Sequence, residues 1–513
     1  MNKLLGRLKT FPIHPLLFAL YPVIFLYAYN FSQVSFFELI VPLVFSLIAT
    51  ILFYGVCALI YRNKEKAAIL VSVGIVFFFF YGNFYDGSKL LVRSVSGSSE
   101  LSTAIIKDRF LLPFVVCLIG GWGTVVFFSR KKFARLSQVF TVISIVLVGL
   151  NCTLIVKDFL QKSNKNGIVK SNPWTSPLKS NGSISGKPDV YFITLDEFVG
   201  SNTLKNYYQY DPAWFFDFLT QQGFHIIPKS RSNYFSTMNC LFSILNMDYI
   251  HYNPDFYGKY NVGSLFESMG YRFFNTMPQR TLSDAFYLKM NDGFIMELIH
   301  CSMLKSLGQE IQRFNILYIF NNFGRLIHEK GPKFIHIHIM CPHVPFVFDS
   351  TGARLPYAEK VNWRNKNIYL GQWIFVAKKM QSVVDSIFTQ SPKPIIIIQS
   401  DHGVRSLPHG GQQPPLISDE KGIVFMDGDS ARPFNYFQVS CNNISAFYFP
   451  DSNYADLYDS MTPVNTFRIV FNHFFNATFP LMPDESYNGP MVTSVTTLKD
   501  TANFQNVTRF TRW

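Results

Sequence analysis

Five long apolar stretches occupy the first third of this 513-residue chain. They cover residues 13–30, 37–61, 67–84, 111–129 and 138–156. Each is close to the length of about 20 residues that an α-helix needs to cross a bilayer. We therefore expect residues 1–157 to form an α-helical membrane domain with about five transmembrane helices.

The composition agrees with a membrane part. Charged residues make up 15% of the chain, whereas about 25% is usual in soluble proteins. The five stretches carry no charged residue near their centres. Because a transporter or a proton pump usually needs ionisable groups at that depth, we interpret these helices as an anchor.

Basic residues outside the stretches predict how the chain is oriented. Three segments are rich in lysine and arginine, namely the N-terminus, the loop after the second stretch and the loop after the fourth: Lys3, Arg7, Lys9, Arg62, Lys64, Lys66, Arg130, Lys131, Lys132 and Arg135. The positive-inside rule places all three segments in the cytoplasm. The N-terminus is then cytoplasmic, and five crossings leave the rest of the chain outside. Topology thus accounts for much of the net charge of +13, and we see no basic stripe that would favour nucleic acid as a partner.

The remaining two-thirds of the chain has the pattern of an α/β domain. Residues 158–188 are rich in Ser, Asn, Gly, Lys and Pro and predict a linker, residues 189–480 form the domain, and residues 481–513 are a tail. Strands are expected at 189–197, 333–340, 393–400 and 446–450, and helices at 211–222, 264–270, 282–299, 303–314, 366–388 and 464–475. This alternation predicts a mostly parallel central sheet covered by helices on both faces.

The cysteines show no metal-binding pattern. Cys240, Cys301, Cys341 and Cys441 lie in the α/β part, without the close pairs typical of zinc sites. An extracytoplasmic domain allows one or two disulfides among them, but the spacing does not indicate the pairing.

Polar side chains follow three of the predicted strands. Asp196 and Glu197 follow the first strand, His343 follows the second, and Asp401 and His402 follow the third. Each has an ordinary explanation as a solvated or capped strand end. Ligands of open α/β sheets, however, bind beyond the carboxyl ends of the strands, where these residues would meet. Carboxylates with imidazole suit zinc or manganese, and carboxylates alone suit calcium or magnesium.

Two hydroxyl residues precede a predicted helix in the stretch "SNYFSTMNCLFSILNMDY", residues 232–249. Ser236 and Thr237 have the position of ordinary helix N-caps. A nucleophile at this place would also benefit from the positive end of the helix. His336 and His338 are interpreted as packed or hydrogen-bonded strand residues, and His409 in "SLPHGG" is a weaker candidate for the site.

The order of these motifs resembles the alkaline-phosphatase superfamily. An acid after the first strand, a threonine before a helix, "PHVPF" after a strand and "SDHG" after another occur in sequence over roughly residues 188–480. The chain looks most like membrane-anchored, sulfatase-like proteins related to lipoteichoic-acid synthases and phosphoethanolamine transferases. The resemblance implies an alkaline-phosphatase-like domain, Thr237 as the nucleophile, four metal ligands and three substrate contacts: Asp196, Glu197, Asp401 and His402, then His343, Arg405 and His409.

The resemblance also implies an activity and a location. It indicates a metal-dependent transferase or hydrolase of phosphodiesters or phospholipid head groups, using zinc, manganese or calcium. The enzyme would lie in the cytoplasmic (inner) membrane of a bacterium, with its α/β domain in the periplasm acting on an envelope lipid or glycan. Hydrolysis of sulfuric esters and binding without catalysis are the alternatives.

Details near Thr237 refine the comparison. Sulfatases mature a Cys or Ser to formylglycine within a motif whose Pro and Arg are missing here, so formylglycine chemistry is not expected. A shift of one residue would make Ser236 the nucleophile. Arg231 and Arg405 lie near the motifs and favour phosphate over sulfate.

Overall fold

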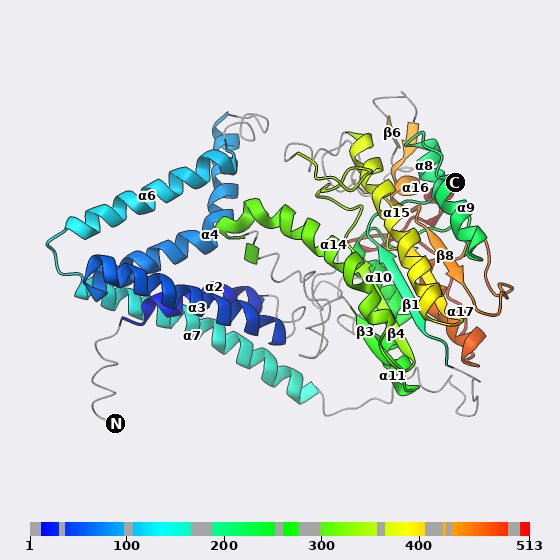
Figure 1. Cartoon of the computed structure of the whole chain (residues 1–513), viewed down its shortest axis with the longest axis horizontal. Helices are drawn as coiled ribbons and strands as arrows, with labels where there is room; N and C mark the ends of the chain where they lie inside the picture. The colour runs from blue at the N-terminus through cyan, green and yellow to red at the C-terminus, as the bar shows by residue number, and fades with distance from the viewer. Residues whose placement is uncertain are drawn as a thin grey trace. The chain divides into compact units, whose positions relative to one another are not determined.

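The computed structural model describes residues 12–29, 36–96, 106–165, 187–251, 260–275, 298–299, 301–356, 365–405, 424–426, 433–490 and 503–513. The chain divides into two compact units (Figure 1). The membrane unit comprises Met1–Val169 and Pro278–Ile311, and the sheet unit comprises Lys170–Met277 and Gln312–Trp513.

The membrane unit is helical. All five apolar stretches form helices: α2 (His14–Tyr29), α3 (Phe36–Tyr61), α4 (Lys64–Ser96), α6 (Asp108–Phe128) and α7 (Ala134–Lys165). Four of them, α3, α4, α6 and α7, are long and apolar enough to cross a membrane. Helix α2 is shorter, with 16 residues. The same unit contains the short 3-10 helix η2 (Met303–Leu307).

Helix α2 contacts α3, α4 and α7. At its start, Nδ1 of the buried His14 lies 2.6 Å from the Ser72 hydroxyl of α4, and its Nε2 lies 3.0 Å from the Ser137 hydroxyl of α7. A buried imidazole needs such partners, because leaving it without them would cost free energy. His14 therefore ties three helices together at one level.

The sheet unit contains a six-stranded sheet with the order β2-β8-β5-β1-β4-β3. Its strands are β1 (Val190–Leu195), β2 (His225–Ile226), β3 (Arg272–Asn275), β4 (Lys333–Ile339), β5 (Ile395–Ser400) and β8 (Ser445–Tyr448). Strands β3, β4, β1 and β5 run parallel, whereas β8 is antiparallel to β5 and to β2. The mostly parallel sheet is therefore confirmed, with predicted strand positions accurate to within two residues.

Helices and short strands complete this unit, although the first four residues of the helix 308–327 group with the membrane unit. The helices are α8 (Ser201–Asn206), α9 (Ala213–Gln221), α10 (Thr237–Asn246), α11 (Asn261–Ser268), α14 (Gly308–Ile327), α15 (Lys366–Gln390), α16 (Tyr436–Cys441) and α17 (Thr466–Phe474), with 3-10 helices η3 (Pro463–Asn465) and η6 (Thr508–Phe510). Two small two-stranded sheets pair β6 (Val424–Met426) with β7 (Pro433–Asn435), and β9 (Tyr487–Asn488) with β10 (Gln505–Asn506). Most of the helix predicted at 282–299 lies outside the described residues.

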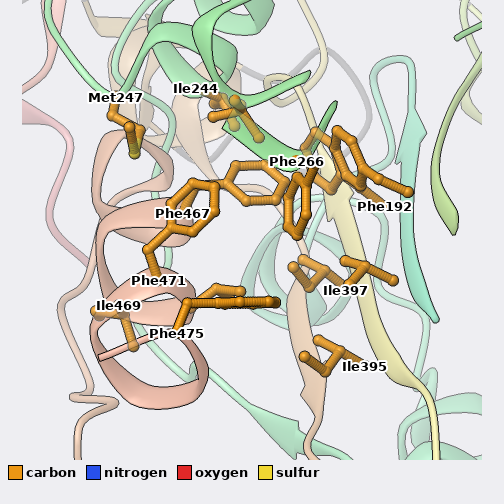
Figure 2. Packing of buried hydrophobic residues seen from close by; sticks show 14 of the residues in the cluster. Phe192, Ile244, Met247, Phe266, Ile395, Ile397, Phe467, Ile469, Phe471 and Phe475 are labelled. Carbon is orange, nitrogen blue, oxygen red and sulfur yellow. The ribbon is translucent and has the colours of Figure 1, made fainter. Parts of the chain in front are cut away.

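Apolar side chains cover both faces of the sheet. On one face, Phe192 of β1 and Ile397 of β5 belong to a buried cluster with side chains of α10, α11 and α17 (Figure 2). On the other face, the Tyr191 ring lies 6.3 Å from that of Phe323 in α14. Alternate residues of one strand thus serve opposite faces, which explains why β1 and β5 are apolar throughout.

The strand register brings three strand ends to one edge of the sheet. Leu195, the last residue of β1, is paired with Ile339 of β4 and with Ser400 of β5. The next residues along β1 and β5 are Asp196 and Asp401. Two acidic residues from distant parts of the chain therefore leave adjacent strands at the same level.

Three described cysteines of the sheet unit, Cys240, Cys341 and Cys441, are buried and form no disulfide. Burial raises the pKa of the Cys441 thiol to about 12. The disulfides that the sequence allowed are thus not formed by these residues.

Gly403 occupies a position where the backbone of another segment approaches closely. An added Cβ would lie 2.3 Å from the Val439 carbonyl oxygen and 2.8 Å from that of Asn442. We expect Gly403→Ala to destabilise the protein by roughly 1–3 kcal/mol, because backbone atoms cannot move aside as a side chain can. The measurement is the unfolding midpoint of the full chain in detergent.

Gly324→Ala is the matched control. A Cβ at Gly324 in α14 meets nothing within 4 Å, and alanine favours a helix over glycine by about 0.5–1 kcal/mol. Equal unfolding midpoints for the two variants would contradict the packing argument.

Candidate active site

Asp401 directly follows β5 and is fully buried. Its Oδ1 accepts hydrogen bonds from the backbone N–H groups of His402 at 2.8 Å and Glu197 at 3.1 Å. Its Oδ2 has no hydrogen-bond partner among the described residues and lies 3.3 Å from His402 Nε2. One oxygen is thus held in place while the other is available to a ligand.

His402 presents its second nitrogen to the same spot. Its Nδ1 lies 2.8 Å from the Gly403 carbonyl oxygen, which assigns the ring proton to Nδ1. Burial, assisted by the nearby Arg405, lowers the pKa of His402 to about 3. The imidazole is therefore neutral at physiological pH, with the Nε2 lone pair directed at the carboxylates, as a metal ligand requires.

Asp196 brings a second buried carboxylate to the cluster. Its Oδ1 has no hydrogen-bond partner in the described part of the chain, and its Oδ2 lies 3.5 Å from Thr237 Oγ1. Burial and the neighbouring Asp401 raise the pKa of Asp196 well above its ordinary value. Two buried carboxylates of like charge are costly without a cation between them.

These three side chains fit a divalent metal. One ligand atom each of Asp196, Asp401 and His402 lies within 4.8 Å of the other two, and all three residues are buried. Two carboxylates and one imidazole are donors that suit zinc or manganese. The unpartnered carboxylate oxygens are the observation that supports a bound cation.

Thr237 lies against this cluster. It is the first residue of α10, and its Oγ1 is 3.5 Å from Asp196 Oδ2 and 3.4 Å from His402 Nε2. Thr237 is partly exposed, whereas the neighbouring Ser236 is buried. The Ser236 side chain forms no cap hydrogen bond with α10. Of the two hydroxyls, Thr237 is therefore the one beside the acids and within reach of a substrate.

Glu197 takes a different place from the other acids. Its backbone is left-handed, with φ of 59°, and its carbonyl accepts a hydrogen bond of 2.6 Å from the Tyr369 hydroxyl. Its carboxylate Oε1 lies 3.4 Å from the backbone N and 3.5 Å from Nε of Arg405. The Glu197 carboxylate therefore lies beside Arg405, and its role as a metal ligand remains a prediction.

Arg405 and His343 add positive charge near the acids. Glu197, Asp196 and Asp401 raise the pKa of Arg405 despite its burial. Burial alone would lower the pKa of His343, but Asp196 and Glu197 outweigh it and raise that pKa above its ordinary value. The backbone N–H of His343 also donates to the Asp196 carbonyl at 3.1 Å. An anion at this edge of the sheet would meet both groups.

Arg231 and His409 are the remaining residues that the sequence analysis named. His409 lies outside the described residues. The Arg231 guanidinium donates to the carbonyl oxygens of Asp484 at 2.6 Å and Ser460 at 3.4 Å. Arg231 thus anchors another loop, so its nearness in sequence does not support phosphate binding.

His338 also lies beside Asp196, a position to which the sequence interpretation gave no role. His336 is packed as expected, with Nδ1 2.9 Å from Asn275 Oδ1 and its ring stacked on Phe192. His338 Nε2, two residues further along β4, lies 3.5 Å from Asp196 Oδ2. The signal was present, because β4 ends at Ile339 and His338 is therefore next to the functional edge.

Comparisons with known proteins give only a remote likeness. No protein family model matches the chain, and no curated protein matches it significantly. The C-terminal periplasmic domain of EcEptC from Escherichia coli is 12% identical with a TM-score of 0.42, covering 64% of this chain and 96% of that domain. A structure of that domain in complex with Zn has 12% identity and a TM-score of 0.40, covering 58% and 86%. A putative sulfatase from Bacteroides thetaiotaomicron has 13% identity and a TM-score of 0.36, covering 57% and 72%.

We expect the full-length protein, stripped with a chelator, to bind a divalent cation and to unfold at a higher temperature when it does. Asp401→Asn should weaken binding roughly 100-fold or more, since changes that only support a ligand already cost about 10- to 100-fold. Titration calorimetry with Zn²⁺, Mn²⁺ and Ca²⁺ measures this. The exposed Asp385 of α15 supplies the control, Asp385→Asn. Equal affinity of both variants would refute the assignment of the site.

Proposed function

We propose that this chain is a metal-dependent enzyme that transfers or hydrolyses phosphodiesters through Thr237. The observation that carries the proposal is the position of the Thr237 hydroxyl, at a helix N-terminus and 3.5 Å or less from Asp196 and His402. A hydroxyl needs activation to act as a nucleophile, and this setting supplies it.

Asp196, Asp401 and His402 would hold the cation. A bound divalent ion would supply positive charge that favours the alkoxide of Thr237 and stabilises a phosphate oxygen. The hydrogen bonds of His402 and Asp401 support this assignment. His402 Nδ1 and Asp401 Oδ1 interact with backbone groups, which leaves Nε2 and Oδ2 for the ion.

The reaction consists of two displacements at phosphorus. Thr237 Oγ1 loses its proton and attacks in line, its bond to phosphorus forms, and the bond to the first alcohol breaks as that alcohol takes up a proton. An acceptor alcohol or water then attacks the phosphothreonine, loses its proton, and releases Thr237 as a hydroxyl. Each displacement forms one bond between oxygen and phosphorus and breaks another, and the only other change is the transfer of protons.

Arg405 and His343 would bind the non-bridging oxygens. Their cationic forms are favoured by Asp196 and Glu197, as the direction of both pKa shifts shows. In this proposal Glu197 orients Arg405 through its carboxylate. A fixed guanidinium stabilises charge that develops in the transition state without reorganisation.

Four helices long and apolar enough to cross a membrane support a membrane location for the enzyme. With the basic loops in the cytoplasm, the sheet unit acts outside it, on an envelope lipid or glycan. Sulfuric-ester hydrolysis on the same residues is the outcome that the following assay separates from phosphoryl transfer.

We expect the full-length, metal-loaded protein to cleave bis(p-nitrophenyl) phosphate and to form a phosphorylated Thr237. Thr237→Ala should lower turnover roughly 1,000-fold or more, because the nucleophile is lost. Thr237→Ser should keep measurable turnover. Absorbance at the nitrophenolate band and mass spectrometry of the quenched enzyme provide the two measurements.

Ser236→Ala is the matched control, and its turnover should stay close to that of the wild type. Loss of activity in Ser236→Ala with retention in Thr237→Ala would transfer the role to Ser236. Turnover of p-nitrophenyl sulfate without turnover of the phosphodiester would replace the proposal by a sulfatase.

A further inference from the structure

A buried glutamine of helix α15 forms four hydrogen bonds with one loop. Gln372 is fully buried. Its Oε1 accepts hydrogen bonds from the backbone N–H groups of Val347 at 2.7 Å and Phe348 at 3.1 Å. Its Nε2 donates to the backbone carbonyl oxygens of Pro342 at 3.0 Å and His343 at 3.1 Å. A side-chain amide has two donors and two acceptor lone pairs, so every hydrogen-bonding position of this side chain is used.

The residues bound in this way belong to the segment 340–348, here called the β4 loop because it follows β4. It contains Pro342 and Pro345, whose nitrogens carry no hydrogen and cannot donate. Its last three residues are buried. Buried backbone groups need partners, and a loop has no regular ladder that supplies them. The amide of Gln372 supplies such partners near both ends of the β4 loop.

His343 is held through its backbone on two sides. Its N–H donates to the Asp196 carbonyl oxygen at 3.1 Å, and its own carbonyl oxygen accepts the hydrogen bond from Gln372. The ring is also fixed, because its Nδ1 lies 2.6 Å from the Val344 carbonyl oxygen. The place of the imidazole therefore follows the place of the β4 loop.

The same helix also fixes the loop that follows β1. The Tyr369 hydroxyl donates to the Glu197 carbonyl at 2.6 Å and accepts from the Val199 N–H at 3.3 Å. Nε1 of Trp373 donates to the Val199 carbonyl at 3.3 Å. The Trp373 ring stacks on Phe198, with 4.6 Å between the ring centroids. Side chains of α15 thus hold the β1 loop as well as the β4 loop.

The spacing of these side chains places them on one face of α15. Tyr369, Gln372 and Trp373 are three and four residues apart, and such residues are neighbours on a helix surface. The ring of Phe348 adds a contact, since it stacks on Phe375 with 4.1 Å between the centroids. One rigid element therefore sets the relative position of two loops that leave adjacent strands of the sheet.

We propose that Gln372 is a positioning residue, which fixes His343 at the distance from Thr237 at which the imidazole binds a phosphoryl oxygen. The inference rests on the proposed function for the role of His343. Because its amide is fully engaged by backbone groups, Gln372 acts through the β4 loop and not on the substrate.

Gln372→Met tests this role, because it keeps the length of the side chain and removes all four hydrogen bonds. In the zinc-loaded, full-length protein, we expect kcat/KM for bis(p-nitrophenyl) phosphate to fall about 10- to 100-fold, as when other groups that support a site are changed. Affinity for inorganic phosphate should fall about tenfold, because a hydrogen bond to a charged group is lost. Titration calorimetry measures this affinity independently of turnover.

A double-mutant cycle with His343→Ala separates positioning from a general loss of stability. His343→Ala removes the imidazole and keeps the backbone groups that Asp196 and Gln372 bind. In this background, Gln372→Met should change kcat/KM and phosphate affinity by less than about twofold, because residues that act as a unit are not additive. Losses that multiply in the double variant would overturn the proposal.

Asn472→Leu is the matched control. Asn472 of α17 also holds a loop through its amide, with Oδ1 accepting from the Phe479 N–H at 2.7 Å and Nδ2 donating to the Phe479 carbonyl at 2.8 Å. Its turnover and phosphate affinity should equal those of the wild type. An equal loss in Asn472→Leu and Gln372→Met would refute a specific role of Gln372. If Gln372→Met does not fold, Gln372→Glu, which keeps the acceptor oxygens and lacks the amide donors, replaces it in the cycle.

The two readouts distinguish this proposal from the proposed function. A protein that shows the expected cycle in phosphate affinity but cleaves no phosphodiester would keep the positioning role and refute the proposed function. A zinc-loaded wild type that binds no phosphate would refute the role of His343 and, with it, the role of Gln372.

Discussion

Two buried carboxylates at the ends of neighbouring strands are the constraint on which the site depends. Asp196 and Asp401 follow β1 and β5 at the same level, and each keeps one oxygen without a hydrogen-bond partner among the described residues. Like charges this close, out of water, are unfavourable unless a cation or a proton compensates. Burial and the neighbouring Asp401 raise the pKa of Asp196, which reflects the same unfavourable environment for its charge. This arrangement of buried carboxylates is one that a bound cation would favour.

The surrounding structure serves to keep these oxygens in place. Backbone N–H groups hold one oxygen of Asp401, and the Gly403 carbonyl selects the tautomer of His402. Gly403 itself is required because the chain passes against the backbone of residues 439–442. The apolar strands β1 and β5 provide a rigid support, and helix α10 begins at Thr237, whose hydroxyl lies beside Asp196 and His402. Rigid elements position catalytic groups more precisely than loops do.

Several elements could be predicted because their signals are local. The run of isoleucines in β5, the apolar stretches of the membrane unit and the helices α9 and α15 depend on nearest neighbours in sequence, and all are confirmed. Convergence of Asp196 with Asp401 and His402 was predicted from the rule that parallel strands end at one edge. That inference needed no contact information, because the sheet itself brings the ends together. The role of Thr237 in catalysis remains a prediction.

Other features depend on contacts between distant residues and have no local signal. Arg231 is close to the motifs in sequence but donates to the carbonyls of residues 460 and 484, and the Glu197 carboxylate lies 3.5 Å from Arg405 Nε. His338 was interpreted as a packed or hydrogen-bonded strand residue. Its place next to the strand end was a signal, but its distance of 3.5 Å from Asp196 depends on the pairing of β4 with β1.

The sequence by itself determined the membrane anchor, the mostly parallel sheet and the set of acids, histidines and hydroxyl at its edge. These follow from hydrophobic periodicity and strand polarity, which are properties of short segments. Only the tertiary structure decided which of those side chains share a site and which oxygens lack hydrogen-bond partners among the described residues. Such features arise from packing between segments hundreds of residues apart. No single segment determines the geometry of that packing.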